Sequence, residues 1–259
     1  MALITGGTRG IGRQIAELLA KSGCSLSLVY RRDRRAAEAA EEDMGREEVG
    51  VQLIRADLAK EEGISDTIEQ AHSRYARLDY FVSNAVFGVL KPVGQFDARR
   101  FDAGMDPNAR AFLLLAQAAA DLMVPPETVG DPWEHQEGPL PARKRIVALS
   151  SLGSHKVMPG YAAVGASKAA IETLTRYLAV ELAPRGIGVN AVSAGVVDTD
   201  SLKAFREHSD WVEEQIARTP LGRIADPSDI ARVVVWLLSD QALWITGQTI
   251  VADGGLSLV

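Results

Sequence analysis

Short apolar runs alternate with amphipathic stretches along nearly the whole chain. The apolar runs have the composition of buried strands, and they are Ala2–Thr5, Ser25–Tyr30, Val51–Ala56, Asp79–Ser83, Arg145–Ser150, Gly188–Val192 and Thr249–Val251. Between them, apolar residues recur with helical spacing. The predicted helices are Ile11–Ser22, Arg35–Met44, Glu61–Tyr75, Ala109–Met123, Gly165–Leu182 and Asp226–Leu238. Strands that alternate with helices predict a parallel sheet covered on both faces.

We therefore expect an α/β protein with a Rossmann-like, doubly wound, parallel seven-stranded sheet. No internal repeat or break in composition divides the chain, so residues 1–259 are expected to form a single domain. Two stretches do not fit the alternation. Residues 124–144 are rich in proline and predict an irregular insertion. Residues 200–219 mix large apolar side chains with charges and follow a strand end, which predicts a flap over the substrate.

Composition narrows the class of protein. The formal net charge of −6 disfavours a general nucleic-acid binder. The single cysteine, Cys24, excludes an internal disulfide and suits a reducing, cytoplasmic environment. No apolar run approaches the roughly 18 residues of a membrane span, and no signal peptide is recognised. The four histidines lack metal-ligand spacing, so no metal site is expected.

A glycine-rich turn joins the first predicted strand to the first predicted helix, in the run Thr5-Gly-Gly-Thr-Arg-Gly-Ile-Gly12. Glycines in such a turn allow the backbone amides to approach a pyrophosphate at the amino end of a helix. Because the turn follows a strand and opens a helix, it predicts dinucleotide binding. The candidate cofactor-binding residues of this turn are Gly6, Thr8, Arg9, Gly10, Ile11 and Gly12.

Basic residues end the second strand, where an acidic residue would select NAD. Arg31 and Arg32 stand there, and Arg9 lies in the glycine turn. Guanidinium groups can donate two parallel hydrogen bonds to a 2′-phosphate, so the sequence favours NADPH. Asp57 and Leu58 after the third strand are placed to contact adenine. Asn84 and Ala85 after the fourth strand are placed along the cofactor.

Tyr161 and Lys168 are the most informative pair in the chain. Six residues separate them, whereas the ordinary tyrosine–lysine pair that serves a nicotinamide has three residues between its members. Val164 fills the ordinary tyrosine position. Both spacings keep the two side chains on one helical face, and the longer one moves the phenol roughly one turn, or about 5 Å, along the axis. In conjugate reduction, negative charge develops on an oxygen two carbons from the carbon that receives the hydride, so a displaced donor suits an enoyl thioester.

Taken together, these motifs resemble the short-chain dehydrogenase/reductase family over essentially the whole chain. The long tyrosine–lysine spacing and the run Leu149-Ser-Ser-Leu-Gly-Ser154 are similar to NADPH-dependent enoyl-acyl-carrier-protein reductases of type III. The resemblance implies that Tyr161 donates to the thioester oxygen and that Lys168 holds the ribose of the nicotinamide. It gives Ser151 a place beside the carbonyl. For Asn108 two roles stay open: it could hold a water next to the lysine, or it could be a helix-capping or core-polar asparagine.

The same resemblance places the segment after the sixth strand beside the nicotinamide, with Gly195, Val197 and Thr199 as cofactor-binding residues. It also implies a homodimer or homotetramer built through the helices around Ala109–Met123 and Gly165–Leu182. Asp106-Pro107 departs from the family pattern and is expected to kink the chain, because proline removes a helix donor.

The sequence therefore predicts a cytoplasmic NADPH-dependent enoyl-thioester reductase of fatty-acid or related acyl-chain biosynthesis. Its substrate would be carried by acyl carrier protein or by coenzyme A. Two alternatives remain. One is a 3-ketoacyl reductase or alcohol dehydrogenase of the same fold, against which Val164 stands because it cannot donate a proton. The other is a non-catalytic dinucleotide-binding sensor, which would not need Tyr161, Lys168 and Ser151 together.

Overall fold

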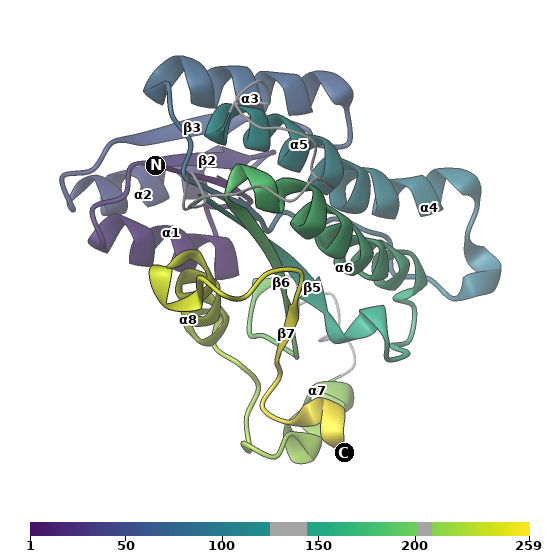
Figure 1. Cartoon of the computed structure of the whole chain (residues 1–259). Coiled ribbons are helices and arrows are strands. Elements are labelled where there is room, and N and C mark those ends of the chain that lie inside the picture. Colours follow the sequence, from purple (N-terminus) through teal and green to yellow (C-terminus); the bar gives the residue numbers. More distant parts are fainter. Residues whose placement is uncertain (125–143, 201, 203–208) are drawn as a thin grey trace.

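Seven parallel strands form one sheet in the computed structural model, which describes residues 1–124, 144–200, 202 and 209–259 (Figure 1). The strand order is β3-β2-β1-β4-β5-β6-β7. The strands are β1 (Ala2–Thr5), β2 (Leu26–Tyr30), β3 (Val51–Arg55), β4 (Tyr80–Ser83), β5 (Lys144–Ser151), β6 (Ile187–Ala194) and β7 (Thr249–Ala252). Chain order reverses beside β1, because β2 and β3 lie on one side of it and β4 on the other. The predicted doubly wound α/β class is confirmed, and the carboxyl ends of β1 and β4 form its switch point.

Helices cover both faces of the sheet. One face carries α3 (Glu61–Tyr75), α5 (Ala111–Met123) and α6 (Ala162–Leu182), and its apolar core includes Phe81 and Phe112. The other carries α1 (Gly10–Lys21), α2 (Arg34–Gly45) and α8 (Pro227–Leu238), packed on Ile4, Leu28 and Val147. Among the described residues, the other helices are α4 (Ala98–Met105), α7 (Ser209–Arg218) and the π-helix η2 (Asp106–Arg110). The described 3₁₀ turns are η1 (Val93–Gln95), η4 (Leu152–Ser154), η5 (Ala183–Arg185), η8 (Asp240–Ala242) and η9 (Leu256–Leu258). Burial of both sheet faces explains why the central strands β1 and β4 are short, almost continuous buried runs, whereas the edge strands β3 and β7 are only partly buried.

The helical path continues through Pro107 as a wider, π-helical turn. Residues Asp106–Arg110 form the π-helix η2, which joins α4 to α5 without a loop. Proline has no backbone N–H, and a π turn is one way for a helix to absorb the resulting mismatch. The predicted disturbance at Asp106-Pro107 is therefore present. The predicted helix start at Ala109 is wrong, because the helical path already runs through η2.

Helix α6 begins at Ala162, three residues before the predicted start at Gly165. Gly160, with φ at +72°, ends the preceding turn, so the helix can form directly after it. Gly165 is tolerated inside the helix because it packs against another element: a Cβ there would lie 2.5 Å from the carbonyl oxygen of Gly153. Tyr161 is the residue directly before α6 rather than part of it. The expectation that Tyr161 and Lys168 share one helix is thus wrong for Tyr161.

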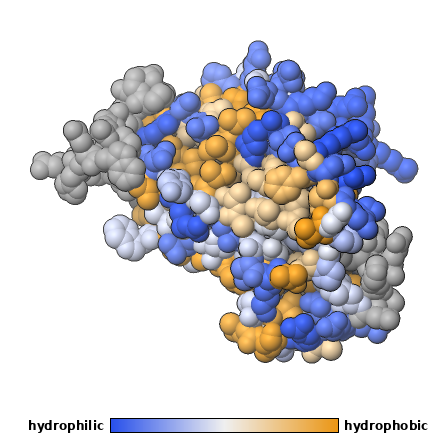
Figure 2. Space-filling model, turned by 90° about the vertical axis from the view of Figure 1, so that its right-hand side faces the viewer, coloured by the Kyte–Doolittle hydropathy of each residue, from blue (hydrophilic) through white to orange (hydrophobic). Residues whose placement is uncertain are grey.

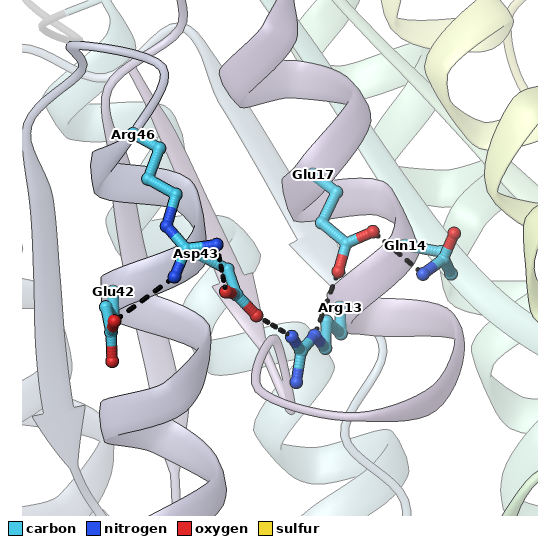
Figure 3. A network of polar contacts seen from close by, with 6 residues as sticks. All are labelled: Arg13, Gln14, Glu17, Glu42, Asp43 and Arg46. Atoms are coloured by element: carbon cyan, nitrogen blue, oxygen red, sulfur yellow. Dashed lines mark hydrogen bonds and ion pairs between the residues drawn. The ribbon is translucent and has the colours of Figure 1, made fainter.

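A chain of polar contacts joins α1 to α2 (Figure 3). Arg13 of α1 forms an ion pair with Glu17 at 2.9 Å and a second one with Asp43 of α2. Asp43 also pairs with Arg46 at 3.3 Å. Surface pairs contribute little stability one by one, but a connected network fixes geometry better. This one holds the amino end of α1 beside α2, next to the glycine turn.

Some predicted segments lie outside the described residues. These are all but the end residues of the insertion at 124–144, and residues 201 and 203–208 of the predicted flap. The rest of that flap contains α7. Figure 2 shows apolar side chains gathered on the side of the molecule on which α4 lies in Figure 1. Within the part of the chain that the structure covers, no helix has both the length and the apolar character needed to cross a bilayer.

Candidate active site

A cavity of about 1130 Å³ opens at the carboxyl edge of the sheet. Five successive strand ends contribute to its wall, with Gly6 after β1, Arg31 after β2, Asp57 after β3, Asn84 after β4 and Ser151 at the end of β5. The cavity therefore spans the switch point, where sheets of this kind bind their ligands. Of the residues predicted from the sequence, all but Gly12 and Asn108 line it.

The glycine turn forms a closely packed wall of this cavity. Gly6 and Gly10 have φ of +64° and +53°, and a Cβ on Gly12 would lie 2.2 Å from the carbonyl oxygen of Gly6. Arg9 caps α1 without a side-chain hydrogen bond, and no acidic residue occupies the first turn. The amino end of α1 thus keeps backbone N–H groups available, which suits an anion such as a pyrophosphate. The glycine turn accordingly fits a dinucleotide.

Asn84 braces this turn. Its Nδ2 donates to the carbonyl oxygens of Thr5 and Gly6 at 3.0 Å each. In return, the hydroxyl of Thr5 accepts from the backbone N–H groups of Asn84 and Ala85, also at 3.0 Å. The amide of Asn84 is thereby used to tie β1 to β4. Asn84 also lines the cavity, so its contact with a cofactor stays a prediction.

The three predicted phosphate-binding arginines do not have the same surroundings. Arg31 forms an ion pair with Asp57 at 3.0 Å, and its guanidinium lies 5.4 Å from the ring centre of Phe87. Arg9 and Arg32 also line the cavity, but their side chains are exposed. Arg31 is therefore committed to neighbours within the protein. Arg9 and Arg32 are the more accessible of the three candidates for a 2′-phosphate.

Tyr161 and Ser151 form the polar centre of the cavity. A hydrogen bond joins their hydroxyls, and the Ser151 Oγ accepts from the backbone N–H of Gly153 at 3.3 Å. The Tyr161 ring lies where a Cβ of Gly153 would come within 2.5 Å, so only glycine leaves it room. Burial raises the pKa of the Tyr161 phenol, while the bond from Ser151 acts in the opposite direction. The phenol consequently keeps its proton at neutral pH, as a proton donor must.

Val164, in the ordinary tyrosine position, is buried and packs against Gly88. A Cβ on Gly88 would come within 2.2 Å of the Val164 Cγ2. The segment after β4 therefore closes tightly over this position. Tyr161 is the tyrosine that the cavity wall presents beside Ser151 and Lys168.

Lys168 is 4% exposed and lies on α6, seven residues after Tyr161. Its Nζ donates to the carbonyl oxygen of Leu149 at 2.6 Å. Burial lowers the pKa of Lys168 to about 8, against the opposing effect of Glu172. An ammonium group has three donors, so this lysine retains donors for a ligand in the cavity.

Asn108 is buried behind the cavity and does not line it. Its Oδ1 accepts from the backbone N–H of Phe87 at 3.0 Å. Its Nδ2 donates to the Phe87 carbonyl oxygen and to Ser167 Oγ, both at 2.9 Å. These bonds tie η2 to the segment after β4 and to α6. Of the roles left open by the sequence, these contacts support a core-polar asparagine, because Asn108 is buried and all of these bonds are within the protein.

The segment after β6 closes the cavity from the other side. Thr199 lies next to the glycine turn, since a Cβ on Gly10 would lie 3.4 Å from the Thr199 Cγ2. Gly195 packs on Asp253, because a Cβ added to Gly195 would lie 2.9 Å from the Cα of Asp253. Gly195, Val197 and Thr199 therefore face the same cavity as the glycine turn, although they are distant from it in sequence.

Sequence patterns alone do not single out several of the cavity's apolar residues. They come from loops, and they are Phe87, Leu90, Val157 and Met158, whereas Trp211 of α7 belongs to the predicted flap and also lines the cavity. The position of Phe87 two residues after Asn84-Ala85 is a signal that could have found it. Where the chain is described, no group of three or more histidine, cysteine, aspartate or glutamate side chains comes together as metal ligands would.

Comparison with known proteins agrees with this geometry. A family model described as enoyl-(acyl carrier protein) reductase matches residues 6–257. The chain belongs to the short-chain dehydrogenase/reductase family, and its members are oxidoreductases. Fold and family together imply a nicotinamide dinucleotide as the cofactor.

Individual relatives cover almost the whole chain. It is 39% identical to 1-cyclohexenylcarbonyl-CoA reductase of Streptomyces collinus, over 100% of this chain and 87% of that protein. It is 34% identical to 3-oxoacyl-(acyl-carrier-protein) reductase FabG of Staphylococcus aureus, over 98% of this chain and 97% of that protein. Among solved structures, a dehydrogenase/reductase from Sinorhizobium meliloti has a TM-score of 0.86 at 33% identity, covering 98% and 94%. Acetoin dehydrogenase from Enterobacter cloacae has a TM-score of 0.84 at 28% identity, covering 100% and 95%.

Proposed function

We propose that this protein reduces the C2=C3 double bond of an enoyl thioester with NADPH. The observation that carries the proposal is the position of Tyr161. Its hydroxyl is bonded to Ser151 and faces the cavity, while a buried valine occupies the ordinary tyrosine position. When bound, the cofactor would supply the hydride. The protein's part is to place a proton donor where negative charge develops.

The proposed roles follow from the contacts of each side chain. The neutral phenol of Tyr161 donates to the thioester oxygen as charge appears there. Ser151, bonded to Tyr161, orients the phenol and stabilises the phenolate that is left after donation. Lys168, held by the Leu149 carbonyl, presents its charge and its remaining donors to the nicotinamide ribose. The turn of Gly6, Gly10 and Gly12 receives the pyrophosphate.

The substrate side of the proposal draws on the apolar wall and on the relatives. Leu90, Val157, Met158 and Trp211 offer an apolar surface for an acyl chain. The substrate named for the Streptomyces relative is a coenzyme A thioester conjugated to a ring double bond. The FabG relative acts on an acyl-carrier-protein thioester. We infer an acyl thioester on either carrier, in fatty-acid or related acyl-chain biosynthesis.

The assembly is also a proposal. We propose that residues 1–259 act as one domain, since a single sheet takes strands from both ends of the chain. Tyr177 and Val180 are exposed apolar side chains on α6, and Phe101 is another on α4. Such side chains favour association. They support a homodimer or homotetramer that buries this side of the helices.

The decisive experiment compares two thioesters of equal chain length. We expect crotonoyl thioester to oxidise NADPH much faster than acetoacetyl thioester, each tested on coenzyme A and on acyl carrier protein. The FabG relative makes carbonyl reduction the specific rival. Faster reduction of acetoacetyl thioester would assign the protein to that rival class. Binding of NADPH without turnover of either thioester or of simple ketones would favour a sensor.

The preference for NADPH predicts the effect of replacing Arg32. The exposed guanidinium of Arg32 lies at the cavity wall, and a charged hydrogen bond to a phosphate contributes about 1.5–3 kcal/mol. Arg32→Ala should therefore weaken NADPH binding about tenfold or more and leave NADH binding nearly unchanged. Fluorescence titration with both cofactors measures this. Arg35→Ala, an exposed position on α2, is the matched control. Equal affinity of the parent protein for both cofactors would remove the arginines as phosphate ligands.

A further inference from the structure

A carboxylate–hydroxyl pair lies directly behind the proposed nicotinamide site. Glu172 follows Lys168 by four residues on α6, so the two side chains share one face of that helix. The hydroxyl of Ser150 donates to Glu172 Oε1 at 2.6 Å. One residue earlier on the same strand, the carbonyl of Leu149 accepts from Lys168 Nζ at 2.6 Å. Adjacent residues of β5 thus fix both charged side chains.

Lys168 is surrounded by protein, so the nearby charge of Glu172 bears on its protonation state. Its ammonium group is buried, and burial disfavours the charged form of a lysine. The charge of Glu172 is the influence that opposes burial. Other titratable groups also lie on α6 and on the elements packed against it. On α6 they are Tyr161 directly before the helix and the exposed Arg176, Tyr177 and Glu181 further along it. On the neighbouring elements they are the Asp106–Arg110 pair of η2 at 3.5 Å, the Asp97–Arg100 pair with Arg99 and Asp102 at α4, the Arg185–Asp121 pair between η5 and α5 at 3.0 Å, His155 and Lys156 after η4, and Lys144 and Arg145 at the far end of β5.

Glu172 does not line the cavity, whereas Ser150 does. The carboxylate therefore has no direct route to a ligand and acts through its neighbours. We propose that Glu172 is a positioning residue whose carboxylate, held by Ser150, keeps the buried ammonium of Lys168 charged and directed into the cavity. This inference rests on the nicotinamide part of the proposed function and is independent of the enoyl substrate.

Glu172→Gln tests the proposal with little change in shape. Glutamine keeps an oxygen that accepts from Ser150 and removes only the charge. NADPH affinity, measured by fluorescence titration without acyl substrate, is expected to fall at alkaline pH as Lys168 loses its proton. In Glu172→Gln the midpoint of that fall should move to lower pH by about one unit. Glu181→Gln, at an exposed position on the same helix, should leave it unchanged. An unshifted midpoint in a folded Glu172→Gln protein overturns the proposal.

A readout that needs no cofactor separates this inference from the proposed function. The folded pKa of Lys168, about 8, is below its ordinary value of 10.5, so the unfolded chain binds more protons between these values and this group makes stability rise with pH there. In Glu172→Gln the rise should begin at lower pH, as thermal unfolding at a series of pH values would show. The same curve in parent and variant contradicts the proposal even if NADPH does not bind.

Ser150→Ala carries the test if the glutamine variant does not fold. It leaves the carboxylate charged but removes the hydroxyl that fixes it. The pH midpoints of its stability and of its NADPH binding should lie between those of the parent and those expected for Glu172→Gln. Glu172→Asp, which keeps the charge, should restore most of the parent's pH dependence. A Ser150→Ala protein with the parent's midpoints would show that the hydroxyl does not hold the carboxylate in place.

Discussion

Tyr161→Phe is expected to lower turnover of an enoyl thioester by roughly 10²- to 10⁴-fold, the usual contribution of a positioned general acid. In the proposed function the phenol acts on charge that appears only in the transition state, so its loss should not weaken binding of NADPH. Phenylalanine keeps the ring that Gly153 accommodates. Steady-state kinetics on crotonoyl thioester and NADPH titration together measure the two effects.

The structure offers a matched control for this substitution. Tyr177 lies on the same helix as Lys168, is 65% exposed and does not line the cavity. Tyr177→Phe removes a phenol hydroxyl and keeps the apolar ring on the helix surface, so it should keep parental activity. Full activity of Tyr161→Phe would contradict the proposed donor. The hydroxyl of Ser151, which is bonded to Tyr161, would then be the next candidate.

Lys168→Met is expected to separate stability from function. Methionine keeps the apolar stem but removes the charge, so NADPH affinity should fall about tenfold or more, with turnover, because a charged hydrogen bond contributes about 1.5–3 kcal/mol. In the absence of cofactor the variant should be more stable than the parent at neutral pH. The lowered pKa of about 8 means that the folded state carries this charge at a cost on the order of 3 kcal/mol. That cost is complete below pH 8 and disappears as pH rises toward 10.5.

Thermal unfolding without ligand and fluorescence titration with NADPH check the two halves of this prediction. Lys21→Met, at an exposed position at the end of α1, is the control for removal of a lysine charge. A Lys168→Met protein that binds NADPH like the parent would exclude Lys168 as a ribose ligand. A variant less stable than the parent at neutral pH would show that the buried ammonium stabilises the fold.

The layout of this fold can be predicted from sequence because its signals are local. Apolar runs mark the buried strands, and the run from Thr5 to Gly12 marks the first turn. Since the carboxyl ends of parallel strands meet at one edge of a sheet, those features are enough to bring Arg32, Asp57 and Ser151 together there. Helix boundaries are predicted less accurately. Gly165 suggests a helix start, although its contact with the distant Gly153 allows the helix to continue through it.

Pairings between distant segments could not be predicted. The amide of Asn84 is bonded to Thr5 and Gly6 at the end of the neighbouring strand β1. Arg31 is paired with Asp57, which follows another strand. Both residues line the cavity, so their contacts with a cofactor stay predictions, but the sequence shows neither of these pairings. The pairing of Ser150 with Glu172 likewise depends on how α6 packs on β5. Each depends on the register between elements, which the periodicity of a single segment does not contain.

Tyr161 directly precedes α6, whereas Lys168 lies within it, and this difference leads to an expectation about the length of the acyl chain. Lys168 lies within a long helix, whereas Tyr161 follows a segment in which Val157 is fully exposed and Gly160 has a positive φ. Val157 and Met158 of that segment also line the cavity. An acyl chain that packs on them would contact the segment that leads to Tyr161, the proposed proton donor, and not the helix that holds Lys168, the proposed ribose ligand. Longer acyl chains are therefore expected to raise the catalytic rate itself, and not only the affinity, because their binding energy is used to set the donor.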